Sequence, residues 1–240
     1  KADMVFTSPP YNANTVVGFE KDGGKSGTRS KPLYDKNETD NKTSDEYIQF
    51  NADIFNTIKT VANEDLVILY NINYNRNSPS DFIDVVNKGR EAFNLVETII
   101  WEKSMAISLA GNNLTRIFEF IFLFFNGNDK PTINKTHPNE CVKNLWKISN
   151  VGANNEIHKA CFPVKLVEQG INLYAKIGAV MYEPFTGSGS TMVAAHQLNR
   201  KCYGMELDPK YCQVIIDRML KLDPSLKVFK NGKPYANPSR

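Results

Sequence analysis

Two stretches of the sequence present groups that could do chemistry, and the first is "FTSPPYN", from Phe6 to Asn12, just after the apolar run "DMVF". Two consecutive prolines cannot donate to a sheet ladder, and they hold the residue before them extended. A strand must therefore end here in a rigid, exposed turn. That turn presents a hydroxyl, an aromatic ring and an amide.

The second stretch is "GAVMYEPFTGSGSTMVAAHQLNRKCYGMELDPKYCQVIIDRML", which predicts a βαβ unit. Its predicted elements are a strand (179–182), a glycine loop (Gly187, Gly189), a helix (190–198) and a strand (202–205) before Glu206. The free N–H groups of the helix and an acid at the next strand end suit a ligand with a ribose. Met192 replaces the third glycine of GxGxxG, which favours a nucleoside without phosphates. An ordinary strand-to-helix turn is the alternative.

These groups must be positioned by the elements around them, which alternate between strands and helices. Apolar runs at 65–72, 95–103 and 118–125 predict buried strands. Helical patterns are predicted after an N-cap at Ser44, at 79–93, at 162–177 and after Glu206. The alternation predicts an α/β fold with a mostly parallel sheet and helices on both faces.

Composition sets the outer limits. With 240 residues, 41% of them apolar, the chain can form one domain with at most a modest insertion. Its net charge of +3 permits an anionic partner without requiring one. Four cysteines without a CxxC pair and three scattered histidines indicate neither a metal site nor disulfides, and they favour a reducing cytoplasm. No apolar run is long enough to span a membrane.

The order of the elements is unusual for a nucleotide-binding sheet. Such folds normally begin with the glycine-loop unit, yet only 34 residues follow Glu206 here. The sheet must be completed by strands that come earlier in the chain. We therefore expect a permuted order, with the ligand half last and the "TSPPYN" half first.

In this order the two stretches resemble the permuted (beta-group) DNA amino-methyltransferases, whose catalytic motif precedes their S-adenosylmethionine motif. "SPPY", 8–11, is similar to the family's catalytic (D/N/S)PP(Y/F) turn, and "EPFTGSG", 183–189, resembles its cofactor loop, usually written with Asp first. "GME", 204–206, resembles the ribose-binding strand end, and "HKACFPVKL", 158–166, the segment that covers the methionine end. "IIWEK" at 99–103 and the Arg116/Glu119 region match more weakly.

The resemblance implies a Rossmann-like, circularly permuted methyltransferase domain over 1–240. Its catalytic half would be about 1–125, its cofactor half about 158–240, and loops 14–43 and 126–157 would read DNA. The implied catalytic residues are Ser8, Pro9, Pro10 and Tyr11. The implied cofactor-binding residues are Thr7, Phe162, Pro163, Glu183, Pro184, Phe185, Gly187, Ser188, Gly189 and Glu206. The implied DNA contacts are Asn12, Lys21, Lys25, Arg29 and Lys31.

The chemistry of that family gives the turn a purpose. The exocyclic amine of a base is a poor nucleophile, and Ser8 Oγ with the Pro9 carbonyl could accept its two hydrogens so that the lone pair points at the sulfonium methyl. Tyr11 could stack on a base flipped out of the duplex. Serine at the first motif position is associated mainly with cytosine N4 and aspartate with adenine N6. We therefore expect cytosine N4, with adenine N6 as the alternative.

Other functions fit less well. Protein glutamine methyltransferases use a similar turn, but their cofactor motif comes first, whereas a non-catalytic DNA-binding module would be expected to lose Ser8 or Glu206. A nicotinamide enzyme is a further alternative, and cytosine C5 methylation is set aside because no Pro-Cys dipeptide is present. The expected partner is double-stranded DNA, with a cognate restriction endonuclease and a homodimer as further candidates. Neither a membrane nor a metal is expected.

Overall fold

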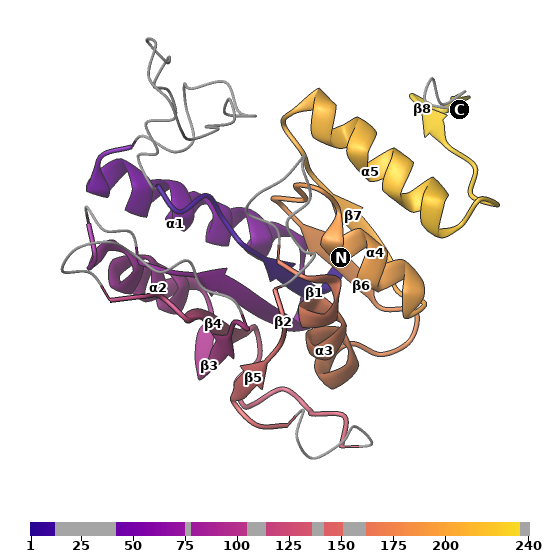
Figure 1. Ribbon diagram of the computed structural model, residues 1–240. Coiled ribbons are helices and arrows are strands. Elements are labelled where there is room, and N and C mark those ends of the chain that lie inside the picture. The colour runs from indigo at the N-terminus through magenta and orange to yellow at the C-terminus, as the bar shows by residue number, and fades with distance from the viewer. Residues whose placement is uncertain (13–41, 75–77, 105–113, 136–141, 151–161, 236–240) are drawn as a thin grey trace, which may run out of the picture.

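The computed structural model describes residues 1–12, 42–74, 78–104, 114–135, 142–150 and 162–235 of the 240-residue chain (Figure 1). Its centre is a seven-stranded sheet in the order β5-β3-β4-β2-β1-β6-β7. The strands are β1 (Ala2–Thr7), β2 (Ala62–Ile72), β3 (Asn94–Glu102), β4 (Phe118–Phe125), β5 (Leu145–Lys147), β6 (Val180–Glu183) and β7 (Lys201–Gly204). The helices are α1 (Ser44–Val61), α2 (Asp81–Ala92), α3 (Val164–Tyr174), α4 (Ser190–Gln197) and α5 (Pro209–Leu222). A separate hairpin pairs β8 (Phe229–Lys230) with β9 (Lys233–Pro234).

The sheet is mostly parallel, as the alternation of elements predicted. β1 pairs in parallel with both β2 and β6, and β6 pairs in parallel with β7. The exception is β4, which runs antiparallel to β2 and to β3. Its N-terminal end therefore lies at the same edge of the sheet as the C-terminal ends of the parallel strands.

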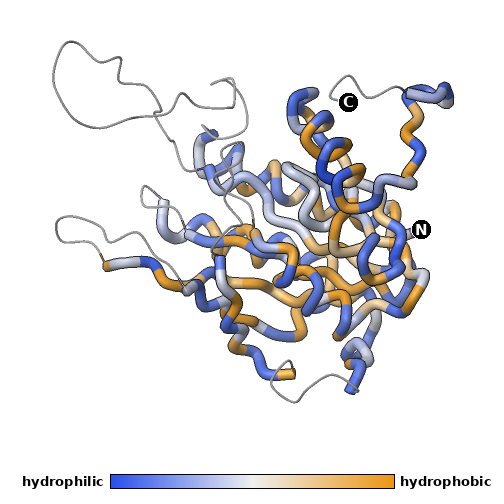
Figure 2. The backbone as a smooth tube through the Cα atoms, turned by 45° about the vertical axis from the view of Figure 1, so that its right-hand side comes forward, coloured by the Kyte–Doolittle hydropathy of each residue, from blue (hydrophilic) through white to orange (hydrophobic). Residues whose placement is uncertain are grey.

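Helices cover both faces of the sheet. Met4 and Phe6 of β1 belong to a core shared with α3 and α4, whereas Val5 between them faces a second core shared with α1 and α2. This alternation follows from the two-residue period of a strand. Figure 2 shows the hydrophobic segments gathered in the central strands and the hydrophilic ones toward the outside. Among the described helices, none is long and apolar enough to cross a membrane.

Two local predictions were wrong. The N-cap of α1 is Thr43 and not Ser44, because Thr43 Oγ1 accepts from the Glu46 amide and the Glu46 carboxylate accepts from the Thr43 amide, which is a capping box. The strand predicted as buried at 95–103 is buried only at Ile99 and Trp101 within β3. Its outer edge pairs with β5 only over residues 100–102, so the rest of the strand reaches the surface.

Candidate active site

The catalytic turn lies beside the glycine loop because their strands are neighbours. β1 ends at Thr7, and it pairs in parallel with β6, which ends at Glu183. The C-terminal ends of parallel strands meet at one edge of a sheet, where ligands of open α/β sheets bind. Residues 8–11 and 184–189 are thereby brought together, as the permuted order predicted.

A buried carboxyl joins the two strands. Thr7 Oγ1 donates to Glu183 Oε1 at 2.5 Å, the Phe185 amide donates to the same oxygen at 3.0 Å, and Thr191 Oγ1 donates to Oε2 at 2.8 Å. Burial raises the pKa of Glu183 to about 8, although the bonds from Thr7, Phe185 and Thr191 oppose that shift. Because Thr7 and Glu183 are both fully buried, they join the two strand ends and expose no atom to a cofactor.

The glycine loop is hydrogen-bonded to the side chain of Glu206. Gly187 and Gly189 adopt φ angles of 53° and 85°, which glycine reaches without strain. The Gly187 amide donates to Glu206 Oε2 at 2.8 Å, and the Asp208 amide donates to Oε1 at 2.9 Å. Glu206 is half-buried, so part of this residue stays accessible to a ligand. A carboxylate beside a glycine loop suits ribose hydroxyls and repels phosphates, so these residues fit a nucleoside cofactor.

The segment predicted to cover the methionine end is present in part. The Phe162 ring lies 5.4 Å from the Phe6 ring, centroid to centroid, and the Phe162 carbonyl accepts from Ser190 Oγ at 3.0 Å. Pro163 is the N-cap of α3. These residues are therefore held between β1 and α4, next to the glycine loop. Residues 158–161 of this motif lie outside the described part of the chain.

Arg218, which the sequence analysis missed, stabilises the glycine loop through hydrogen bonds from α5. Arg218 on α5 donates from Nη1 to the Ser188 carbonyl at 3.0 Å and to Ser190 Oγ at 3.3 Å. Ile215, one turn earlier, lies 3.2 Å from where a Cβ on Gly189 would be. No sequence motif marks Arg218, because its role depends on α5 packing against a loop that precedes it by 30 residues.

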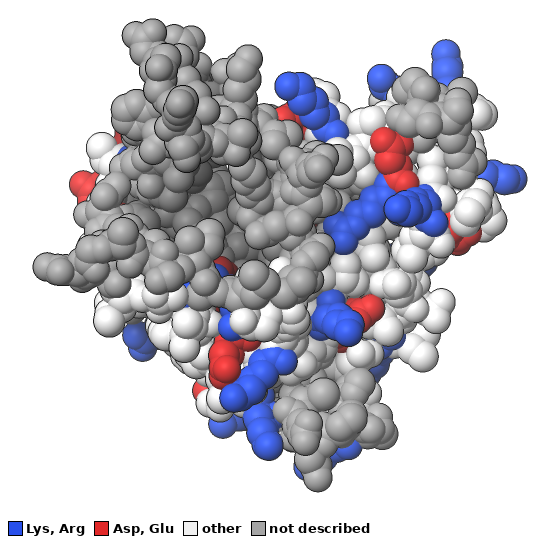
Figure 3. All heavy atoms as spheres, in the orientation of Figure 1, with Lys and Arg blue, Asp and Glu red and all other residues white. Residues whose placement is uncertain are grey.

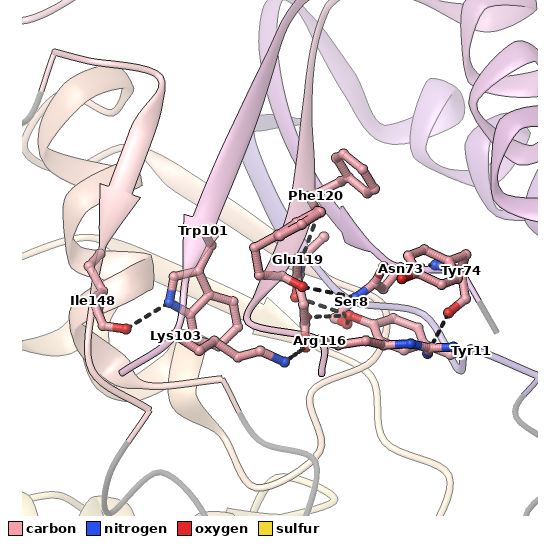
Figure 4. A network of polar contacts seen from close by, with 12 residues as sticks. Ser8, Tyr11, Asn73, Tyr74, Trp101, Lys103, Arg116, Glu119, Phe120 and Ile148 are labelled. Carbon is pink, nitrogen blue, oxygen red and sulfur yellow. Dashed lines mark hydrogen bonds and ion pairs between the residues drawn. The ribbon is translucent and has the colours of Figure 1, made fainter. Parts of the chain in front are cut away.

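On the other side of the catalytic turn, a chain of polar contacts leads into the sheet (Figure 4). Ser8 Oγ donates to the Tyr11 hydroxyl at 3.0 Å, and that hydroxyl donates to Glu119 Oε2 at 2.9 Å or to Asn71 Oδ1 at 3.2 Å. Lys103 Nζ lies 2.7 Å from Glu119 Oε1. Burial and the charge of Glu119 raise the pKa of Tyr11 well above its ordinary value.

The strand topology explains this cluster. Asn71 lies near the end of β2, whereas Glu119 lies at the start of the antiparallel β4, so both reach the edge where β1 ends. Glu119 and Lys103 belong to the weakly matching motifs of the sequence analysis. Asn71 was missed, although an amide inside the apolar run "LVILYNI" was a visible signal.

The predicted DNA contacts are placed less fully. Asn12 is buried with a φ angle of 51°, and its amide group bonds to the backbone N–H and carbonyl of Lys42 at 2.7 and 2.8 Å. Its side chain therefore ties together the two ends of segment 13–41. Lys21, Lys25, Arg29 and Lys31 lie within that segment, outside the described residues. Within the described part of the chain, no group of three metal-ligating side chains is found.

Comparison with known proteins agrees with this geometry. A family model described as DNA methylase, of the N6 and N4 type, matches residues 2–217. The chain is 30% identical over 186 residues to the orphan methyltransferase M.BamHII of Bacillus amyloliquefaciens, an alignment that covers 61% of this chain and 69% of that protein. The chain spans 21% to 45% of the length of four further methyltransferases that it matches.

Solved structures share the fold. The cytosine-N4-specific PvuII DNA methyltransferase superposes with a TM-score of 0.66 at 20% identity, covering 94% of this chain and 81% of that one. The complex of M1.HpyAVI with S-adenosylmethionine gives a TM-score of 0.65 at 18% identity, covering 91% and 89%. The fold is thus the Rossmann-like fold of these enzymes. With its family model matched from residue 2 to residue 217, the chain belongs to the DNA methylase family, the N6- and N4-amino-methyltransferases.

Proposed function

We propose that this protein transfers the methyl group of S-adenosylmethionine to the exocyclic amine of a base flipped out of DNA, and that the base is cytosine, methylated at N4. One observation carries the proposal: the SPPY turn and the glycine loop follow neighbouring parallel strands, joined by the Thr7–Glu183 bond of 2.5 Å. A base held at the turn and a cofactor held at the loop would then lie side by side.

On the cofactor side, Glu206 would bind the ribose hydroxyls, and the backbone from Phe185 to Gly189 would lie beside the methionine end. When bound, S-adenosylmethionine supplies an activated methyl group on sulfur. Arg218 and Glu183 contact the loop from behind and would keep it in the conformation that binds.

On the base side, Ser8 and Pro9 would orient the amine. Because Ser8 Oγ gives its own hydrogen to Tyr11, its lone pairs are left to accept from the base. The Pro9 carbonyl would accept the second amine hydrogen, so that the nitrogen lone pair turns toward the methyl group. The half-buried Tyr11 ring, anchored through its hydroxyl, would stack on the base.

Among the residues of the site, the choice of cytosine rests on Ser8, because both amines need the same two acceptors. The likeness to the cytosine-N4-specific PvuII enzyme supports that choice, while the family as a whole includes N6 enzymes. Adenine N6 is the second candidate.

Segment 13–41 would supply phosphate contacts through its lysines and arginine. On the face shown in Figure 3, the basic side chains of the described residues stand in separate groups beside acidic ones, without a continuous basic track. A matched restriction endonuclease and a homodimer remain proposals.

The test is to methylate unmodified plasmid DNA with the purified protein, digest it to nucleosides and weigh these by mass spectrometry. We expect N4-methyldeoxycytidine, and a Ser8→Ala variant that binds S-adenosylmethionine normally but reacts roughly 10²-fold more slowly. If N6-methyldeoxyadenosine is the only methylated nucleoside found, the target base is adenine and the proposal of cytosine is wrong. No methylated base of either kind on any DNA would refute the proposed function.

A further inference from the structure

The contacts behind Ser8 form a directed chain of hydroxyl groups that ends at a carboxylate. Ser8 Oγ donates to the Tyr11 hydroxyl at 3.0 Å, and the Tyr11 hydroxyl donates to Glu119 Oε2 at 2.9 Å. In both bonds the donor lies on the Ser8 side and the acceptor on the Glu119 side, and the contact of the Tyr11 hydroxyl with Glu119 is shorter than its alternative contact with Asn71 Oδ1 at 3.2 Å. Figure 4 shows the contacts among Ser8, Tyr11 and Glu119. Such aligned bonds polarise one another.

The hydrogen-bond chain ends at the carboxylate of Glu119, which forms an ion pair with Lys103. Glu119 Oε1 lies 2.7 Å from Lys103 Nζ, and these two side chains are only 15% and 17% exposed. The other oxygen of the carboxylate, Oε2, accepts from Tyr11. Lys103 Nζ also lies 5.8 Å from the centre of the Trp101 ring, whose Nε1 donates to the Ile148 carbonyl, so the lysine is held in place. The carboxylate is therefore fixed where it can accept a hydrogen.

The reaction leaves a proton to dispose of. When the base nitrogen forms its bond to the methyl carbon, the C–S electron pair returns to sulfur, and the nitrogen carries a positive charge until it loses a hydrogen. A neutral serine hydroxyl is a poor acceptor for that proton unless it can release its own. The directed chain gives Ser8 a place to release it.

We propose that Tyr11 and Glu119 form a proton relay behind Ser8, an inference that rests on the proposed function. As the methylated amine loses its hydrogen to Ser8 Oγ, the Ser8 proton passes to the Tyr11 oxygen, and the Tyr11 proton passes to Glu119 Oε2. Three protons move one place each, the two hydroxyl groups are regenerated, and Glu119 ends neutral. Tyr11 and Glu119 are thus positioning residues that act through Ser8, in addition to the stacking role of the Tyr11 ring.

The test uses three variants that preserve shape: Tyr11→Phe, Glu119→Gln and the double variant. Methyl transfer is measured in a single turnover at saturating S-adenosylmethionine and DNA, in H2O and in D2O. We expect each single variant to slow the reaction roughly 10²-fold, the scale of general acid–base catalysis, with the double variant no slower than the slower single. We also expect the solvent isotope effect of the wild type to vanish in Tyr11→Phe.

Tyr74→Phe is the matched control, because it removes the hydroxyl of a nearby tyrosine. The bond from Arg116 goes to the backbone carbonyl of Tyr74, and the substitution leaves that carbonyl in place. Its rate should stay close to that of the wild type. Thermal unfolding and cofactor affinity of all variants show whether the site has collapsed.

Rates of Tyr11→Phe or Glu119→Gln within about threefold of an active wild type would overturn the relay and leave the proposed function standing. The relay would also be overturned if the double variant slowed methyl transfer by the product of the two single effects, or if the solvent isotope effect persisted in Tyr11→Phe. Either result indicates that the two residues have separate packing roles. A wild type without activity on any DNA would remove the proposed function, and the relay with it.

Discussion

The buried carboxyl of Glu183 should make this protein less stable as the pH rises through neutrality. Its side chain is fully buried, and burial raises its pKa from an ordinary value of 4.5 to about 8. Between these values the folded protein holds a proton that the unfolded chain has released, so the unfolded state binds fewer protons. The free energy of unfolding therefore falls as the pH rises in this window.

The magnitude follows from the two pKa values. A pKa of about 8 in place of 4.5 lowers the free energy of unfolding by roughly 2 to 3 kcal/mol between pH 5.5 and pH 7.5, and the loss per pH unit becomes smaller as the pH approaches 8. Glu183→Gln removes the titration but imitates the protonated form. The glutamine oxygen can still accept from Thr7 and from the Phe185 amide, and its NH2 group can donate to Thr191.

The assay is urea unfolding of the wild type and of Glu183→Gln at the two pH values. We expect the variant to gain roughly 2 to 3 kcal/mol relative to the wild type between pH 5.5 and pH 7.5. Glu91→Gln is the control, since Glu91 lies on the surface in an ion pair with Lys88 and should give no such gain. The reasoning is refuted if the stability difference between wild type and Glu183→Gln changes by less than about 0.5 kcal/mol from pH 5.5 to pH 7.5, because a change of that size is near the error of the extrapolation.

Two further variants probe the cofactor side. Glu206→Ala should weaken binding of S-adenosylmethionine by about 1.5–3 kcal/mol through lost charged hydrogen bonds, and unchanged affinity in calorimetry would remove Glu206 from the ribose site. Gly189→Ala should destabilise the protein by more than the roughly 1–2 kcal/mol of a left-handed backbone, since its Cβ would also press on Ile215. Gly178→Ala is the control, because Gly178 has a φ angle of 80° and no atom lies within 4 Å of the added Cβ, so urea unfolding should show the backbone cost alone. Equal losses of stability in Gly178→Ala and Gly189→Ala would contradict a steric contribution from Ile215.

The sequence predicted elements well where hydrophobicity is continuous. The run "FEFIFLFF" gave the bounds of β4 correctly, 118–125, and the polar residue Asn126 follows its last phenylalanine directly. It could not reveal that β4 runs antiparallel, since a run of apolar residues carries no direction. The error at the start of α1 was avoidable, because Thr43 has a glutamate three residues later and Ser44 has Tyr47.

The site was predicted in part for a similar reason. Short motifs located the SPPY turn, the glycine loop and Glu206, which are each local in sequence. Asn71 and Arg218 were not found, because their contacts join residues 60 and 30 positions apart and depend on how strands and helices pack. The roles assigned to individual residues stay predictions until the variants are measured.

The position of β1 in the sheet has a consequence for synthesis of the chain. β1 leaves the ribosome before both of its partners, because it pairs with β2 on one side and with β6 on the other. The bond from Thr7 to Glu183 spans 176 positions, so one edge of β1 has no partner until residues 180–183 emerge. An unpaired apolar edge invites association with other chains, and such distant pairing is slow. Nascent chains that stall before β6 should therefore depend on chaperones, and the enzyme should stay inactive until its cofactor half has been made.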